Sequence, residues 1–413
     1  MAFNPLDEKG IPMEKQIHPW ADLNVEPYRA KNVHPYTRTR IIAMNGIEVE
    51  AAIFMHQFNR HTVNPELKKE LAMVRRTEQL QQKVVNWLIP ATESILELTL
   101  GYEQVAVDLT AWLAQTEPDP NVKQALDFAL LEDFDHLYRY ANLYTMDTGQ
   151  DPADIVGNYT EIMPGRPTIA EHRHPHDSLT MHYDAESADI LTKLHVLTIV
   201  PAEQQTMNFY MNVGNRYETM LGRGLFQEIG MIEEQHVSHY ECLADPTVSW
   251  LDRMLLHEYN ECYLYYSCME TETDPRIKKI WEQHLDMEIA HLHGAIDLIK
   301  KFEGRDATEM LPAHFPELVV FQSNKEYIRK IIEEQVDLTK DGKEYVRVGE
   351  LPEDHRYFQY QKMVNDDGVP SRDVIEQHIE QKQQDFRIET EGDHPIGPLQ
   401  DRKSVDDQVA RAA

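Results

Sequence analysis

Apolar residues recur every three or four positions over long stretches of this chain, which is the spacing typical of amphipathic α-helices. The pattern covers eight stretches, namely 41–62, 66–88, 91–117, 120–147, 187–218, 222–243, 246–272 and 275–303. Pro90 and Pro246 mark breaks between helices, and Gly149 closes the first set of four. The sequence therefore predicts an all-α fold built from two successive sets of four helices.

The two sets of helices are related by an internal duplication. Residues 116–136 read TEPDPNVKQALDFALLEDFDH and residues 271–291 read TETDPRIKKIWEQHLDMEIAH, so equivalent residues differ by 155 (271 minus 116). The Thr-Glu-x-Asp-Pro turn is shared by both copies. The duplicated polar positions are Asp133-x-x-His136 with Glu288-x-x-His291, Glu103 with Glu258, and Glu78 with Glu233.

Residues 41–303 are therefore predicted to form one duplicated helical domain, with flanking segments at both ends. Its parts are repeat one (41–149), a His-rich connection (150–185) and repeat two (186–303). The connection contains four histidines without regular ligand spacing, so we interpret it as a polar link.

Two further segments flank this domain. Residues 1–40 are rich in proline and polar residues, which favours an extended arm. The C-terminal extension, 304–413, has a mixed pattern, with helices expected at 324–338 and 371–386 and a short strand at 345–348.

Composition narrows the class of partner. The chain has 413 residues, of which 41% are hydrophobic and 27% charged, and its net charge is −31. This charge disfavours nucleic acid and anionic membranes, because phosphate groups would be repelled. There is no apolar run of membrane-spanning length, and the N-terminus lacks the features of a signal peptide. Three cysteines without a Cys-x-x-Cys pair add the expectation of a cytoplasmic protein.

The duplicated acids lie on apolar helix faces. Glu103 shares its face with Leu100 and Val107, and Glu288 shares its face with Leu285 and Leu292. A carboxylate buried among apolar side chains must be protonated, paired or bound to a cation. The pattern therefore indicates a functional site and not a solvated surface.

Spacing along each helical hairpin supports a shared site. Glu103 precedes its turn by about as many residues as Asp133 follows it, which places both roughly 20 Å from the turn at a rise of about 1.5 Å per residue. The same relation holds in the second copy. Two hairpins that face each other would bring together four carboxylates and two imidazoles, a set suited to two iron or manganese ions. The predicted ligands are Glu103, Asp133, His136, Glu258, Glu288 and His291.

At this point the chain resembles the ferritin-like superfamily of di-iron and di-manganese carboxylate proteins, in which two Glu and two Glu-x-x-His motifs meet inside a four-helix bundle. The resemblance covers 95–144 and 250–299. It implies a ferritin-like core formed by the third and fourth helices of both repeats. The chain departs from the family pattern at Asp133, which is shorter by one methylene than the usual Glu. Glu132 competes for this role, but its counterpart is Met287, so we prefer Asp133.

Four more residues are candidates for additional ligands or for groups that hold a ligand in place: Glu78, Glu233, His236 and Glu261. Glu233-x-x-His236 forms another acid-x-x-His pair, for which a supporting or structural role is favoured over direct ligation. Glu261 is an alternative to Glu258, but it breaks the 155-residue register.

The resemblance implies an oxidoreductase that uses two iron ions, two manganese ions or a mixed pair to activate dioxygen or peroxide. A small-molecule substrate or oxygen species, an external electron donor and self-association are the partners expected. Two alternatives stay open from sequence. One is a ferroxidase or iron-binding protein, and the other is a metal-free structural bundle whose buried acids and histidines pair with each other.

Overall fold

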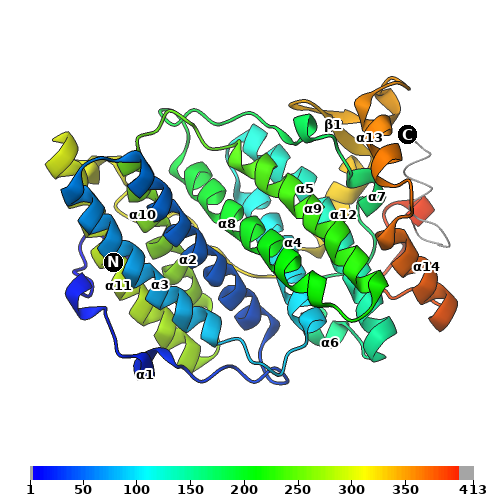
Figure 1. The fold of residues 1–413 in the computed structure, drawn as a ribbon, viewed down its shortest axis with the longest axis horizontal. Coiled ribbons are helices and arrows are strands. Elements are labelled where there is room, and N and C mark those ends of the chain that lie inside the picture. Colours follow the sequence, from blue (N-terminus) through cyan, green and yellow to red (C-terminus); the bar gives the residue numbers. More distant parts are fainter. Residues whose placement is uncertain (1–2, 400–413) are drawn as a thin grey trace. The chain divides into compact units, whose positions relative to one another are not determined.

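Helices dominate the fold, as the sequence predicts. The computed structural model describes residues 3–399, and in that range it contains fourteen α-helices and one two-stranded sheet (Figure 1). The first repeat forms α2 (Pro35–His61), α3 (Pro65–Trp87), α4 (Ile95–Thr116) and α5 (Pro120–Thr148). The second forms α8 (Ile190–Val213), α9 (Met220–Glu241), α10 (Trp250–Thr271) and α11 (Pro275–Glu303). The all-α expectation is confirmed.

The helix ends explain why the turns are duplicated. Asp119 and Asp274 each accept two backbone N–H groups at the start of α5 and α11, directly before a proline in the first turn. Gly149 and Gly304 end the same two helices in the left-handed conformation, with φ of +69° and +68°. The helix α2 begins at Pro35, earlier than predicted, because the side chain of His34 accepts the N–H of Tyr36.

The chain divides into two units whose segments alternate along the sequence. Unit 1 comprises residues 1–92, 184–202 and 245–321, and unit 2 comprises 93–183, 203–244 and 322–413. Each unit combines helices from both repeats. The helix α8 contributes to both units, because it passes from unit 1 to unit 2 between Ala202 and Glu203.

Unit 1 is organised around four long helices. Both α2 and α11 pack on α3 and on α10, so the four helices enclose a common interior. Figure 1 shows the blue α2 and α3 beside the yellow-green α10 and α11. Buried apolar side chains from all four line this interior, among them Ile41, Leu71, Leu255 and Leu292.

Unit 2 is organised in the same way around α4, α5, α9 and the second half of α8. The helix α5 packs on α4 and α9, and Phe209 of α8 stacks on Tyr102 of α4 with ring centroids 4.4 Å apart. Further helices cover this group: α6 (Ala153–Val156), α7 (Thr168–Glu171), α12 (Lys325–Gln335) and α14 (Pro370–Lys382).

This pairing differs from the expected architecture. We predicted one core made by the third and fourth helices of both repeats, within a single domain over 41–303. In the structure those hairpins belong to different units, α4 and α5 to unit 2 and α10 and α11 to unit 1. Each hairpin instead buries its apolar face against the first and second helices of the other repeat.

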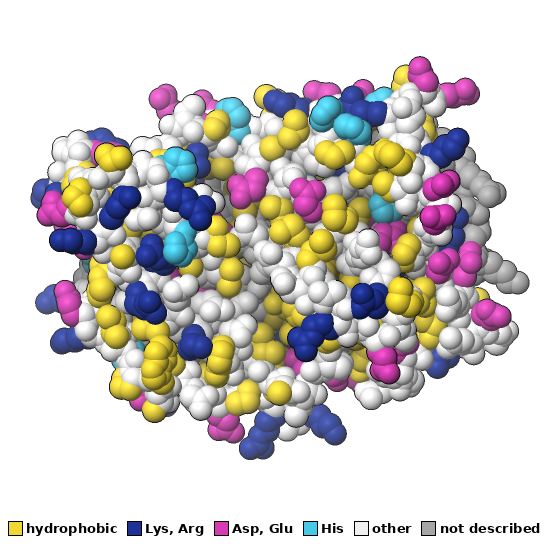
Figure 2. Space-filling model, viewed as in Figure 1, with side chains coloured by type: hydrophobic (Ala, Val, Ile, Leu, Met, Phe, Trp, Pro, Cys, Tyr) yellow, Lys and Arg dark blue, Asp and Glu magenta, His cyan; other side chains and the backbone are white. Residues whose placement is uncertain are grey.

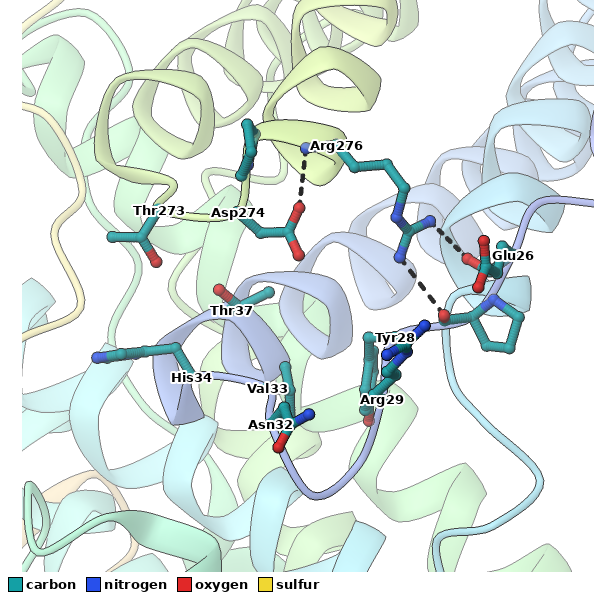
Figure 3. Close-up of a pocket in the computed structure, with 12 residues that line it drawn as sticks. Glu26, Tyr28, Arg29, Asn32, Val33, His34, Thr37, Thr273, Asp274 and Arg276 are labelled. Atoms are coloured by element: carbon teal, nitrogen blue, oxygen red, sulfur yellow. Dashed lines mark hydrogen bonds between the residues drawn. The ribbon is translucent and has the colours of Figure 1, made fainter.

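The N-terminal arm is tied to unit 1. It carries a short helix, α1 (Trp20–Leu23), and contacts α11 at several points, among them the N–H of Ile11, which donates to the carbonyl oxygen of Asp286. Arg276 extends its guanidinium to the carbonyl oxygens of Glu26 and Pro27, at 2.5 and 3.4 Å. These residues border a pocket of about 500 Å³ (Figure 3).

The C-terminal extension is divided between the units, with 304–321 in unit 1 and the described residues from 322 onward in unit 2. The strands β1 (Leu338–Asp341) and β2 (Glu344–Arg347) form an antiparallel hairpin, where the sequence indicated only a strand at 345–348. The helices α12 and α14 match the predicted pair, and α13 (Arg356–Val364) was not predicted. Residues 400–413 of the extension and 1–2 of the arm lie outside the described residues.

Charges of both signs are interspersed with hydrophobic side chains on the face shown in Figure 2. None of the helices between residues 3 and 399 combines the length and apolarity needed to span a bilayer.

Candidate metal centres

The interior of unit 2 holds two overlapping groups of acidic and histidine side chains. One consists of Glu103, Asp133, His136 and Glu233, and the other of Asp133, Glu203, Glu233 and His236. In each group, one nitrogen or oxygen atom from every member lies within 4.8 Å of the others. Because Asp133 and Glu233 belong to both groups, they could bridge two neighbouring ions.

The carboxylates of this cluster are buried with few donors. All six side chains are 0 or 1% exposed. Both oxygens of Asp133 and both of Glu203 accept no hydrogen bond, and neither does one oxygen each of Glu103 and Glu233. Unsatisfied buried carboxylate oxygens are costly in a dry interior, and a divalent cation removes that cost.

The two histidines present the same ring nitrogen to the cluster. Nδ1 of His136 lies 3.1 Å from Glu233, and Nδ1 of His236 lies 3.1 Å from Asp133. Their Nε2 atoms face outward, 2.9 Å from Glu171 and 2.8 Å from Glu132. An outer carboxylate that accepts N–H from a histidine leaves the other nitrogen free to bind metal.

The outer carboxylates are themselves held in place. Glu132 is bound by the guanidinium groups of Arg166 and Arg173, with Arg166 Nη1 at 2.9 Å and Arg173 Nη2 at 3.0 Å. Both arginines and Glu171 come from the connection at 150–185 and are buried. That segment is therefore not merely a polar link, because its charged residues pack under the cluster and hold the groups that orient the histidines.

Electrostatics within unit 2 follow from burial and these partners. Burial raises the pKa of Glu103 and of Glu203 well above the usual range. Burial also raises the pKa of Glu171, to about 8. Burial opposes protonation of His136 and His236, but the surrounding carboxylates raise the pKa of both rings, which favours their protonated form where no cation is bound. Although burial disfavours its charged form, hydrogen bonds from these protonated rings lower the pKa of Glu233 to about 2. A cation would favour the ionised form of all these carboxylates.

Three tyrosines of unit 2 border the cluster. The hydroxyl of Tyr210 donates a hydrogen bond to Glu103. The hydroxyls of Tyr140 and Tyr240 are buried without a hydrogen-bond partner among the described residues. The pKa of each of these two hydroxyls is raised, first by burial and then by nearby carboxylates, Glu103 for Tyr140 and Glu203 for Tyr240.

Unit 1 contains a related cluster at the equivalent positions. Glu78, Glu258, Glu288 and His291 each place an atom within 4.8 Å of the others, and all are 0% exposed. Nδ1 of His291 lies 2.8 Å from Glu78 and 3.1 Å from Glu288. Both oxygens of Glu258 accept no hydrogen bond.

The pKa directions in unit 1 again reflect burial. Burial, followed by the charge of Glu288, raises the pKa of Glu78 to about 7. Burial likewise raises the pKa of Glu48, Glu258 and Glu261. Burial opposes ionisation of Glu288 too, but the His291 charge and hydrogen bond lower its pKa.

A pocket of about 290 Å³ borders the unit 1 cluster. Gln16, Gln81, His284 and Met287 are among its lining residues. Gln16 and Gln81 also contact the cluster, at His291 and Glu288 respectively. Glu78, Glu258, Glu288 and His291 do not line the pocket, so Gln16 and Gln81 lie between it and the cluster.

The predicted ligands thus lie in two sites and not in one. Glu103, Asp133 and His136 meet Glu233 and His236 in unit 2, whereas Glu258, Glu288 and His291 meet Glu78 in unit 1. The expectation that all six converge was wrong because the hairpins pair differently. Glu261 is buried on α10 outside the four-residue group of unit 1, and Glu132 lies outside both groups of unit 2.

Sequence reasoning missed the two acids contributed by the first helix of each repeat. Glu48 of α2 and Glu203 of α8 are buried in units 1 and 2, and they differ by the repeat offset of 155 (203 minus 48). Extending the repeat comparison to these helices would have found them. The outer partners Glu171 and Gln16 carry no such signal, because neither belongs to the duplicated helices.

No model of a known protein family matches this chain, and neither does any curated protein or solved structure.

Proposed function

We propose that unit 2 is a ferritin-like four-helix bundle that holds two iron or manganese ions, and that the protein is an oxidoreductase acting on dioxygen or peroxide. The observation that carries this proposal is the sharing of Asp133 and Glu233 between two four-residue groups. Four carboxylates and two imidazoles balance two divalent cations, and oxygen with nitrogen ligands suits iron or manganese.

The residues present fit this cofactor. Buried polar groups in a structural helical core normally have hydrogen-bond partners, but both oxygens of Asp133 and of Glu203 lack one. In a metal-free structural bundle those oxygens would remain unsatisfied, and burial would keep several acids protonated. The outward N–H groups of His136 and His236 already have acceptors, so their Nδ1 atoms are available for ligation.

Two bound ions would supply the electrons that reduce dioxygen or peroxide. The chain's own residues hold the ligands, exclude bulk water and retain protons nearby. Complete burial of the cluster favours small reactants. The hydroxyl of Tyr210 orients Glu103. The hydroxyls of Tyr140 and Tyr240 stay protonated beside the carboxylates, and a reduced oxygen species would accept these protons.

The test is metal content and reactivity after anaerobic loading with ferrous ion and removal of excess. Glu233→Ala should lose the ions of unit 2 while circular dichroism stays helical, and it should abolish metal-dependent consumption of dioxygen or peroxide. Glu161→Ala is the matched control, because Glu161 is a buried partner of Arg329 in unit 2 outside the cluster. Absence of metal from the loaded wild type would overturn the proposal, and large uptake of iron would favour storage.

A further inference from the structure

The two clusters differ in the type of ligand at one of six equivalent positions, and a second position has Glu in unit 1 and Asp in unit 2. Equivalent residues in units 1 and 2 are Glu48 and Glu203, Glu78 and Glu233, Glu258 and Glu103, Glu288 and Asp133, and His291 and His136. The sixth position is Gln81 in unit 1 and His236 in unit 2. The inference below rests on the proposed function, because it concerns how many ions this second centre holds.

The amide of Gln81 is directed at the carboxylates. Its Nε2 donates a hydrogen bond to Glu288 and lies 3.5 Å from Glu48 Oε1. In unit 2, the counterparts Asp133 and Glu203 flank Nδ1 of His236, at 3.1 and 3.5 Å, and accept no hydrogen bond from an amide. The Gln81 amide therefore donates hydrogen bonds to Glu48 and Glu288, whose counterparts in unit 2 would instead contact a second metal ion.

Glu48 is also engaged by residues that unit 2 lacks. The hydroxyl of Tyr265 donates to Glu48, and Nδ1 of His284 lies 3.0 Å from that hydroxyl. The equivalents of Tyr265 and His284 are Thr110 and Ala129, which cannot form such a chain. These contacts occupy one oxygen of Glu48, and Glu48 lies outside the compact four-residue group of unit 1.

The other four residues retain the features of a metal site. Glu78, Glu258, Glu288 and His291 form a compact group, and no hydrogen bond reaches the two oxygens of Glu258. Three carboxylates and one imidazole are sufficient for a single ion.

We propose that unit 1 binds one metal ion through Glu78, Glu258, Glu288 and His291, and that the Gln81 amide replaces the second ion. The chain then holds a pair of ions in unit 2 and a single ion in unit 1. A single ion can neutralise the buried carboxylates and stabilise the helices around them, but it lacks the second ion that a two-metal redox step requires.

Gln81→His is the decisive variant, because it restores the residue found at the equivalent position of unit 2. Metal per chain is measured by elemental analysis after anaerobic ferrous or Mn(II) loading and desalting. The wild type should bind about three ions and Gln81→His about four. The reverse exchange, His236→Gln in unit 2, is the matched control and should lower the count by about one.

Spectroscopy assigns the count to each unit. In a Glu233→Ala background, Mn(II)-loaded protein should show the electron paramagnetic resonance signal of an isolated ion. Adding Gln81→His should replace this signal with that of two spin-coupled ions. In the otherwise wild-type protein, Glu258→Ala should abolish the signal of the isolated ion while leaving the ions of unit 2. Circular dichroism verifies that each variant remains folded.

The outcomes separate the two proposals. If the wild type binds about four ions and Glu258→Ala removes two, unit 1 is a full pair, with Glu261 or the Gln81 carbonyl as the missing ligand, and the single-ion inference is overturned. If the wild type binds two ions that Glu233→Ala removes, unit 1 is metal-free and the inference again fails, but the proposed function stands. No binding in the wild type would overturn both.

Discussion

Nε2 of His236 lies 2.8 Å from Glu132, a carboxylate adjacent in sequence to Asp133 but directed away from the cluster. Asp133 faces the opposite ring nitrogen of the same histidine, at 3.1 Å. Two consecutive residues of α5 therefore hold one imidazole from both sides. The outer carboxylate, Glu132, fixes which ring nitrogen carries the proton. The inner carboxylate, Asp133, faces the same proposed metal position as the other ring nitrogen.

Glu132→Gln should weaken metal binding in unit 2 by about 10–100-fold, because the outer partner of His236 loses its charge and part of its hold on the ring. Competition with a chromogenic chelator measures this affinity. Glu161→Gln, which alters another buried ion pair of unit 2, should leave it unchanged. Equal affinity in Glu132→Gln and wild type would show that Glu132 serves only Arg166 and Arg173.

Gln16→Ala should weaken metal binding in unit 1 by a similar factor. The side chain of Gln16 places Oε1 2.7 Å from His291 Nε2 and donates to the carbonyls of Ile11 and Met287. Its removal leaves Nε2 of His291 with only the Thr77 hydroxyl, at 3.1 Å, among the described residues, and it removes the donor to these two carbonyls. The expected cost is about 1–3 kcal/mol in unfolding free energy. Gln115→Ala, in unit 2, serves as control. An unchanged affinity of the unit 1 site would contradict a positioning role.

Lys340 predicts a pH-dependent stability. Its side chain is 0% exposed, its Nζ lies 4.3 Å from the Tyr345 ring centroid, and burial followed by Arg173 lowers its pKa to about 7. Between this value and the unfolded pKa of about 10.4, the unfolded chain binds a proton that the folded chain does not. The stability penalty is therefore complete below about pH 7 and shrinks as pH rises.

Lys340→Met should accordingly stabilise the protein most near pH 6. Its advantage over wild type should fall by at most about 1.4 kcal/mol per pH unit above pH 7. Urea unfolding at several pH values measures the difference. Lys343→Met, on the exposed turn after β1, should show no such trend. A constant difference across pH would mean that Lys340 is charged in the folded protein throughout.

Gly165→Ala should destabilise unit 2 through a steric effect. A Cβ at this position would lie 2.3 Å from the carbonyl oxygen of Leu131 and 3.1 Å from the backbone nitrogen of Asp135. Backbone on α5 cannot yield cheaply, so the segment that carries Arg166 must shift, at a cost of about 1–3 kcal/mol. Thermal unfolding tests this. Gly397→Ala is the control, because a methyl group there meets nothing within 4 Å.

The helices and several site residues were predictable from sequence because they depend on local pattern. Caps such as Asp119 and Asp274, followed by proline, specify where helices begin, and the repeat offset identifies Glu103 with Glu258. The pairing of hairpins was not predictable in this way. The apolar faces of α4 and α5 indicate that another element must bury them, but they do not indicate which hairpin it is.

The supporting residues were hidden for a different reason. Glu171 ends the four-residue helix α7 and Arg173 follows it, in a segment whose sequence shows no sustained helical period, and Gln16 lies in the arm. Their roles come from long-range contacts, namely Glu171 to His136 and Gln16 to His291. No spacing rule links residues so far apart in the chain.

The alternation of segments between the units is the arrangement of a symmetric homodimer that exchanges hairpins, contained in one chain. Each repeat gives its first hairpin to one unit and its second hairpin to the other, so both clusters draw residues from both repeats. Two copies of one shorter chain would carry the same residue at equivalent positions. Within a single chain the repeats can differ, as they do at Gln81 and His236.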